Sequence, residues 1–334
     1  MKGALLAALA ALACAAPPPP PVAEISDGRP AMGTILEITL FAPATPSAHE
    51  TLDELFALAL RLDASLTLYD PKSELSRLNR SAGRGAIQVD PELARILAAS
   101  VGYSRLTRGA FDVTVGPLVA LWTQAGQTGA LPSDAALERA RALVGASQIE
   151  VEGTEVTLAH EGVSIDLGGV AKGWALDRML PLLRDRGIER ALLDFGQSSV
   201  WALGAPPGAA GWRLLARGPD EAALGVLTLA DQALSISGSL GEWVEIGGRR
   251  YGHVLDPRSG QALERRRQAL VVAPNATLAE ALSKGLLILG EVEGIALVAA
   301  QPGCEGMLVD ADGGSWETSG WRAAVRFEGF VSNP

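Results

Sequence analysis

Cysteine, histidine and long apolar stretches are scarce in this chain of 334 residues, which has two Cys and three His. No Cys/His cluster suits zinc, and after the amino terminus no stretch is long and apolar enough for a transmembrane helix. Lys and Arg number 28 against 38 Asp and Glu, giving a net charge of −10. The short run 264–267 (Glu-Arg-Arg-Arg) is the one basic cluster, and we interpret it as a solvated turn. Nucleic-acid binding needs clustered positive charge and is therefore excluded.

The first 22 residues form an expected leader. Lys2 precedes an apolar run from Ala4 to Ala13, which is too short to span a bilayer but typical of a signal peptide. Residues 11–14 (Ala-Leu-Ala-Cys) are similar to a lipobox, which predicts lipidation of Cys14, with the Pro-rich tract 17–21 as a stiff tether. The alternative is a simple cleaved signal with an incidental Cys14. Both interpretations predict export, and the first places the protein at the periplasmic face of the membrane. Both leave only Cys304, so an internal disulfide is excluded.

The remainder, residues 23–334, is expected to form one domain. Hydrophobic residues make up 48% and charged residues 20%, as in globular proteins. Periodicity and capping residues predict helices over 50–66, 91–106, 133–144 and 171–186, and a further helix that contains 279–284 and ends at Gly290. Strands are expected over 34–41, in a hairpin around Gly153, and repeatedly between 191 and 273. This order predicts an α+β fold with much antiparallel pairing rather than a regular βαβ alternation.

Two Gly-punctuated segments combine turns with charged side chains. In 109–118, Asp112 follows a Gly turn, where it can accept hydrogen bonds from a ligand or cap local backbone. In 165–173, glycines allow close backbone approach, a helix start offers N–H groups to a phosphate, and Lys172 adds positive charge. A Gly-rich turn that merely starts a helix explains the second segment equally well. Neither a P-loop nor a dinucleotide fingerprint is present.

Two later segments contain fewer side chains that could bind a ligand or take part in catalysis. The hydroxyl-rich run 234–239 is most simply a structural turn. The segment 251–260 places His253 shortly before an Asp-Pro turn, and the nearby Asp256 and Arg258 favour a site over a purely structural histidine. Taken together, the four segments predict an exported α+β protein that binds a phosphorylated ligand, as an enzyme.

These segments, in this order, resemble the ApbE family of flavin transferases, the FAD:protein FMN transferases. The shared motifs are AMGT (31–34), SELSRLN (73–79), GAFDVTVGP (109–117), DLGGVAKG (166–173), HVLDPRSG (253–260) and the helix around 279–284. The resemblance begins at Ala31 and runs almost to the carboxyl end. It implies an ApbE-like mixed fold with largely antiparallel sheets and packed helices.

The resemblance also implies an activity and a set of site residues. Family members bind FAD with Mg²⁺ and move FMN onto a Thr or Ser hydroxyl of a partner protein, releasing AMP. The partner expected here belongs to an exported or membrane redox complex. Gly169 would offer a backbone carbonyl to the metal, and His253 would be the base near the attacking hydroxyl. By matching positions, the FAD site would be lined by Met32, Ala110, Phe111, Asp112, Asp166, Lys172 and Leu255.

The chain departs from the family pattern where the metal is expected. The family helix reads A-D-A-L-x-T, with Asp and Thr as metal ligands, whereas residues 279–284 read Ala-Glu-Ala-Leu-Ser-Lys. Glu280 can still reach a cation, but a protonated Lys284 cannot ligate Mg²⁺ and repels it. Two further motifs differ, since 236–240 read Ile-Ser-Gly-Ser-Leu for T-S-G-D-Y, and 194–197 read Asp-Phe-Gly-Gln for Asn-Phe-Gly-Gly.

Three functions fit these departures. The expected one is a flavin transferase with an altered metal site. The second is a lipoprotein that binds FAD without transferring it, in which Lys284 supplies a fixed positive charge at the metal position. The third is a pseudoenzyme that has lost flavin and acts as an assembly factor for an exported redox complex.

Overall fold

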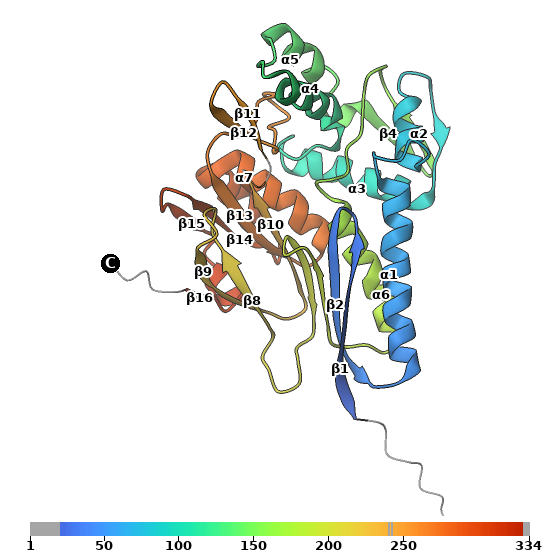
Figure 1. Cartoon of the computed structure of the whole chain (residues 1–334), viewed down its shortest axis with the longest axis vertical. Helices are drawn as coiled ribbons and strands as arrows, with labels where there is room; N and C mark the ends of the chain where they lie inside the picture. Colours follow the sequence, from blue (N-terminus) through green and yellow to red (C-terminus); the bar gives the residue numbers. More distant parts are fainter. Residues whose placement is uncertain (1–20, 240, 242, 330–334) are drawn as a thin grey trace, which may run out of the picture.

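The structure is a computed structural model that describes residues 21–239, 241 and 243–329 (Figure 1). Cys14 and most of the expected leader lie outside the described residues. The first strand begins at Val22, where the expected leader ends.

An antiparallel sheet of eight strands forms the centre of the fold, in the spatial order β1-β2-β6-β7-β10-β13-β14-β15. Its strands are β1 (Val22–Ala31), β2 (Thr34–Pro43), β6 (Ala191–Phe195), β7 (Ser199–Leu203), β10 (Gln232–Gly238), β13 (Arg267–Ala273), β14 (Glu305–Asp310) and β15 (Ser315–Glu317). Neighbouring strands pair antiparallel throughout. The predicted α+β class with antiparallel pairing is therefore confirmed.

Three smaller sheets and eight α-helices complete the described part of the chain. The small sheets contain β3 (Ile87–Gln88), β5 (Glu155–Leu158) and β4 (Ile149–Glu152); β16 (Glu328–Gly329), β9 (Ala223–Leu229) and β8 (Trp212–Arg217); and the hairpin β11 (Trp243–Ile246) with β12 (Arg249–Gly252). The helices are α1 (Pro46–Leu66), α2 (Glu74–Arg80), α3 (Pro91–Leu106), α4 (Gly116–Thr128), α5 (Asp134–Arg141), α6 (Ala171–Asp185), α7 (Ala276–Ala299) and α8 (Trp321–Ala324). Short 3₁₀ turns span Val113–Val115 and Ala146–Gln148.

Both faces of the large sheet are covered, which explains why β13 is buried over most of its length. Because side chains alternate along a strand, Ala269 and Val271 join the core beneath α1, α6 and α7, while Leu270 and Val272 join a second core. The second core lies under β8, β9 and α8, on the other face of the sheet (Figure 1). Helix α7 crosses β10, β13 and β14, and most of its residues before Gly290 are buried against the sheet.

A third, smaller core lies at one end of the molecule, where α4 and α5 pack against the β11–β12 hairpin (Figure 1). Trp122 of α4 lies 5.2 Å, between ring centroids, from Tyr251 of β12. The Trp122 indole N–H donates to the Gly260 carbonyl at 2.8 Å. This cluster fixes the 253–260 loop against the α4–α5 pair.

The helix boundaries agree well with the sequence patterns. Asp90 caps α3 by accepting the N–H of Glu92, and Pro91 opens the helix, as predicted. The hairpin around Gly153 is confirmed as β4–β5. The helix that contains 279–284 ends at Gly290 as predicted, where a positive φ of 80° makes a kink, and a second helical segment continues α7 beyond it. The sequence analysis missed β1 and α4. Within the described residues, no helix has both the length and the apolarity needed to cross a membrane.

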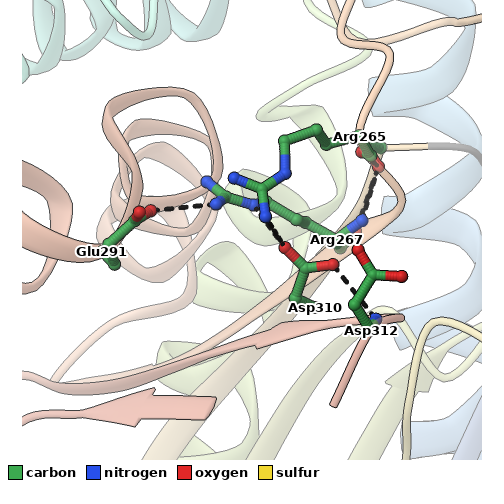
Figure 2. Close-up of polar contacts among 6 residues, drawn as sticks. Arg265, Arg267, Glu291, Asp310 and Asp312 are labelled. Carbon is green, nitrogen blue, oxygen red and sulfur yellow. Dashed lines mark hydrogen bonds and ion pairs between the residues drawn. The ribbon is translucent and has the colours of Figure 1, made fainter. Parts of the chain in front are cut away.

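The interpretation of residues 264–267 as a solvated turn is wrong for its last member. Glu264 and Arg265 are exposed, but the Arg267 side chain is only 11% exposed and pairs with Asp310 at 3.1 Å and Glu291 at 3.0 Å. Figure 2 shows these carboxylates converging on the two arginines. Arg267 also lies over the Trp316 ring, 5.9 Å from its centroid. Arg267 begins β13, so the sheet carries its side chain inward under the α7 kink.

Candidate functional site

The first turn of α7 is held against α6 by Asp177. This carboxylate accepts the backbone N–H of Ala276 at 2.7 Å and that of Thr277 at 2.8 Å, and it also accepts the Thr277 hydroxyl. Gly173 permits the contact, because a Cβ there would lie 2.6 Å from the Ala276 carbonyl oxygen. The two helices therefore meet closely at the point where α6 begins and where the residues that follow Thr277 enter the core.

Glu280 lies inside the protein, with a relative exposure of 1%. One of its carboxylate oxygens accepts a hydrogen bond from the Ser199 hydroxyl of β7. The other, Oε2, is buried and has no hydrogen-bond partner within the described residues. Since burying an unpartnered carboxylate oxygen is costly, Oε2 marks a place where a cation or a donor is expected.

Ser283, one residue before Lys284, is fully buried, and its hydroxyl has several hydrogen-bond partners. Its hydroxyl lies 3.0 Å from the Ser235 hydroxyl and 2.8 Å from that of Ser237, both on β10. It also lies 3.0 Å from the Glu280 carbonyl oxygen. These contacts fasten the middle of α7 to the sheet.

Lys284 is partly buried and lies against the Gly-rich turn before α6. A Cβ built on Gly169 would be 3.3 Å from Cε of Lys284 and 3.8 Å from the Phe111 ring. Desolvation lowers the pKa of Lys284; the charge of Glu280 opposes this effect, and the charge of Lys172 reinforces it. The Lys284 ammonium makes no hydrogen bond or ion pair with any described residue. No described residue therefore contacts it directly, and Glu280, one helical turn away, acts on it through its charge alone.

Lys172 lies in the first turn of α6, and its ammonium donates to the Ser198 hydroxyl at 2.5 Å. Ser198 follows the turn formed by 194–197, where Asp194 accepts the N–H of Gln197 at 2.7 Å. Burial raises the pKa of Asp194, and the charge of Lys172 partly offsets the rise. Because Ser198 binds Lys172 and Ser199 binds Glu280, these two serines link the two charged groups.

The predicted FAD residues Asp112 and Asp166 use their carboxylates locally. Asp112 accepts the Ser104 hydroxyl at 2.6 Å, the Thr114 N–H at 2.8 Å and the Thr114 hydroxyl at 2.5 Å. Asp166 accepts the Gly168 N–H at 2.8 Å, and its own N–H donates to the Val113 carbonyl at 2.7 Å. Both carboxylates therefore shape the turns that bring Phe111 and Gly169 together.

The other predicted residues surround this centre at different depths. Ala110 and Phe111 are buried in the turn after α3. Leu255 is buried in the third core, and His253 lies on an exposed loop, where a Cβ at Gly241 would be 3.6 Å from its ring. The loop reaches the Phe111 turn, because a Cβ at Gly109 would lie 3.6 Å from Cγ of Arg258.

Met32 lies at the turn between β1 and β2, at the edge of the site. Its N–H donates to Asp63 at 2.8 Å, and it lines a hollow of 430 Å³ together with Gly33 and Asp63. The same hairpin packs on the 194–197 turn, since the Gly196 N–H donates to the Ile35 carbonyl at 3.1 Å. A second hollow of 590 Å³ lies beside Tyr103, Trp174 and Asp177. It contains none of the predicted site residues, and Asp177 in it serves to cap α7.

The residues at the expected metal position do not fit a divalent cation. The orphan Oε2 of Glu280 would suit one, but Lys284 places an ammonium group beside Gly169, the other expected ligand. The Ser283 hydroxyl is occupied by serines of β10. No group of three or more Asp, Glu, His or Cys side chains gathers as a metal site would, within the residues that the structure describes. Hard cations such as Mg²⁺ need several oxygen ligands and no adjacent cation.

Sequence reasoning missed the serines that connect these groups. Ser198 ends the turn before β7, Ser199 begins β7, and Ser235 and Ser237 lie on β10, all far from α7 in sequence. Only the hydroxyl-rich run 234–239 gave a weak signal, and it lies almost entirely in β10 rather than in the expected turn. Asn79 of α2 was seen only as part of a motif. Its amide exchanges two hydrogen bonds with the backbone of Ile165, at 2.8 and 3.0 Å, and so holds the segment that leads into the Gly168–Gly169 turn.

Known proteins resemble this chain in sequence and in fold. The model of the ApbE family matches residues 32–308. The FAD:protein FMN transferase of Vibrio cholerae is 28% identical over 334 residues, covering 98% of each chain. The protein of that name from Haemophilus influenzae is 27% identical over 281 residues, covering 80% of this chain and 81% of the relative.

Solved structures agree with the sequence relatives. The fold superposes on the flavin transferase ApbE from Vibrio cholerae with a TM-score of 0.79 and 25% identity, covering 91% of this chain and 99% of the other. The ApbE protein from Thermotoga maritima gives a TM-score of 0.82 at 25% identity, covering 91% of this chain and 100% of that one. Because the family model spans most of the described residues and the fold is shared, the chain belongs to the ApbE family.

Proposed function

We propose that this chain transfers FMN from FAD to a Thr or Ser hydroxyl of a partner protein, with release of AMP. The observation that carries the proposal is the meeting of Lys172 and Lys284 around the Gly169 turn, at the start of α6. No side chain caps the first turn of α6. The Ala171 N–H donates to the Leu167 carbonyl, so the N–H groups of Lys172 and Gly173 and the two ammonium groups are the donors offered to the diphosphate of a dinucleotide.

The chemistry is a displacement at phosphorus. The acceptor hydroxyl oxygen attacks the phosphorus of the FMN half of FAD, and a new P–O bond forms. The bond between that phosphorus and the bridging oxygen breaks, and AMP leaves with the electron pair. The hydroxyl proton passes to His253, which lies on the exposed loop above the site, and from there to solvent. Positive groups fixed near the diphosphate stabilise the charge that develops on the leaving phosphate.

The comparisons support the transferase over the alternatives. The two relatives named above are both called FAD:protein FMN transferase, and the match covers 98% and 81% of their lengths. None of the comparisons favours a flavin-storage lipoprotein or a pseudoenzyme. The buried Glu280 and the neighbouring lysines also argue that this region has remained a charged site rather than becoming an apolar core.

The direct test mixes the purified protein, without its leader, with FAD and a flavin-acceptor domain. Covalent flavin fluorescence on the acceptor band and a mass gain of one FMN group are the expected results. Replacement of the acceptor Thr or Ser by Ala should abolish the label. An acceptor that stays unlabelled under all conditions, metal present or absent, would overturn the proposal.

His253→Ala should slow transfer strongly while leaving FAD binding close to wild type, since the ring acts on the incoming hydroxyl. The matched control is His49→Ala, because His49 lies exposed on α1 and contacts only the Thr45 carbonyl among the described residues. Equal rates for both variants would remove His253 from the reaction.

We also propose that the protein is exported and anchored through Cys14, so that its acceptor is an exported or membrane redox protein. Metabolic labelling with a radioactive fatty acid tests the anchor. Wild-type protein should incorporate label and fractionate with membranes, and Cys14→Ser should do neither. A labelled Cys14→Ser protein, or an unlabelled wild type, would contradict lipidation at this residue.

A further inference from the structure

We propose that the Lys284 ammonium occupies the place of the divalent cation, so that this chain binds the diphosphate of FAD without a metal ion. The inference rests on the proposed function for the identity of the ligand. It concerns how the charge of that ligand is balanced. The disagreement between the residues present and a Mg²⁺ site is its starting point.

The distribution of lysine is the first support. The described residues contain three lysines, Lys72, Lys172 and Lys284, and only Lys72 lies on an exposed surface away from the site. The other two act electrostatically on each other across the Gly169 turn. Two like charges held close together repel each other. The Glu280 charge offsets part of this repulsion for Lys284, and an anion between the two ammonium groups would offset it for both.

The second support is hydrogen bonding. An ammonium group has three donors, and that of Lys284 meets no acceptor among the described residues. The Lys172 ammonium donates one hydrogen bond to Ser198, which leaves its other N–H donors for a ligand. The uncapped first turn of α6 adds backbone N–H groups at the same place. A diphosphate supplies several acceptor oxygens and two negative charges, which matches this set of donors.

The third support is the position of the carboxylates. Glu280 directs one oxygen to Ser199 and leaves Oε2 buried and unpartnered, one helical turn from Lys284. Lys284 thus balances the Glu280 charge from one side and faces the Gly169 turn from the other. Asp166 accepts the Gly168 N–H, and Asp194 accepts the Gln197 N–H. A metal ion placed here would find one free carboxylate oxygen as a ligand and would be repelled by the neighbouring ammonium group.

The experiment measures FAD affinity by flavin fluorescence on the metal-stripped protein, in EDTA and then in excess Mg²⁺. Wild type should bind FAD equally well in both. Lys284→Thr should bind about tenfold more weakly in EDTA, because a charge-assisted contact is lost, and Mg²⁺ should restore much of the affinity. Lys284→Met should be weakened without rescue, because it offers no oxygen ligand. Lys284→Arg should keep metal-free binding.

The matched control is Lys72→Met, which removes an exposed positive charge and should leave FAD affinity unchanged. Circular dichroism and thermal melting of each variant show whether it is folded. If Lys284→Thr does not fold, the wild-type comparison in EDTA and Mg²⁺ still decides. Wild-type binding that requires Mg²⁺, or no FAD binding in either condition, would overturn the inference.

The outcomes separate this inference from the proposed function. Metal-independent FAD binding with no transfer to any acceptor would support the role of Lys284 and reject the transferase. Transfer that occurs only with Mg²⁺, with FAD binding abolished by EDTA, would support the transferase and reject the role of Lys284.

Discussion

Asp177 in α6 accepts hydrogen bonds from both the backbone N–H and the hydroxyl of Thr277 in the first turn of α7. Through this contact one helix sets the position of the segment that carries Glu280 and Lys284. Trp201 adds a further hydrogen bond to the same carboxylate from its indole N–H, at 3.2 Å. The carboxylate therefore links α6, α7 and β7.

Asp177→Ala should destabilise the protein by about 2 kcal/mol, because it leaves several buried donors unpaired at a helix start. It should also weaken FAD binding, since the Lys284 segment loses its anchor. Asp177→Asn keeps one acceptor oxygen and should cost less. Urea unfolding and FAD titration of both variants check the prediction, which fails if Asp177→Ala is as stable as wild type.

Gly169→Val should weaken FAD binding by about tenfold or more, because a Cβ at this position would lie 3.3 Å from Cε of Lys284 and a larger side chain would displace it. The matched control is Gly102→Ala on α3, where a Cβ would meet nothing within 4 Å. That change should raise stability by about 0.4–1 kcal/mol and leave FAD binding intact. Equal FAD affinities for the two variants would contradict the prediction.

Arg267→Met should cost about 3–5 kcal/mol of unfolding free energy, because it leaves Asp310 buried without its inner partner. Arg265 pairs with the same carboxylate at 2.5 Å, but its side chain is 60% exposed. Arg265→Met should therefore change stability by no more than about 1 kcal/mol. Chemical denaturation of the two variants gives the comparison, and similar losses would refute the distinction between an inner and an outer arginine.

The lowered pKa of Asp310 predicts that the stability of the protein depends on pH. Burial alone would raise its pKa, but hydrogen bonds from the Asp312 N–H and from Arg267, with the charges of both arginines, hold it below the usual range. Its contribution to stability is therefore full above the unfolded pKa of about 4 and is lost as pH falls through the lower folded value. The stability gap between wild type and Asp310→Asn should be largest near neutral pH and shrink in acid. A gap that grows on acidification would contradict the assignment.

Sequence patterns predicted local structure better than the connections between distant segments. The cap at Asp90-Pro91 and the turn at Gly153 were readable because their signals lie within a few residues. The spread of leucines around the 277–289 helix correctly indicated that Glu280 is internal. Arg267 was misread because an arginine beside two exposed arginines shows no sign of pointing inward. Its burial depends on its place as the first residue of β13 and on carboxylates from two other elements.

The position of the site could be predicted from the sequence, but the hydrogen bonds that connect its residues could not. The motifs named Gly169, Lys172, Glu280 and Lys284, and the structure places them around the start of α6 and the middle of α7. The serines that join them lie in the turn before β7, on β7 and on β10, and these strands reach α7 only through the order of strands in the sheet. A single sequence contains no periodic signal for contacts of that kind, because each serine alone is compatible with any strand.

The kink at Gly290 has an electrostatic consequence. It makes the first part of α7 a helix with two ends of its own, whose partial charges are positive at Asn275 and negative near Gly290. Asp177 lies at the positive end, and the guanidinium of Arg267 comes within 3.2 Å of a Cβ placed on Gly290, at the negative end. The dipole of this segment is thus compensated by two structural residues. Glu280 and Lys284 lie between these two ends, so neither charge is needed to compensate the helix dipole.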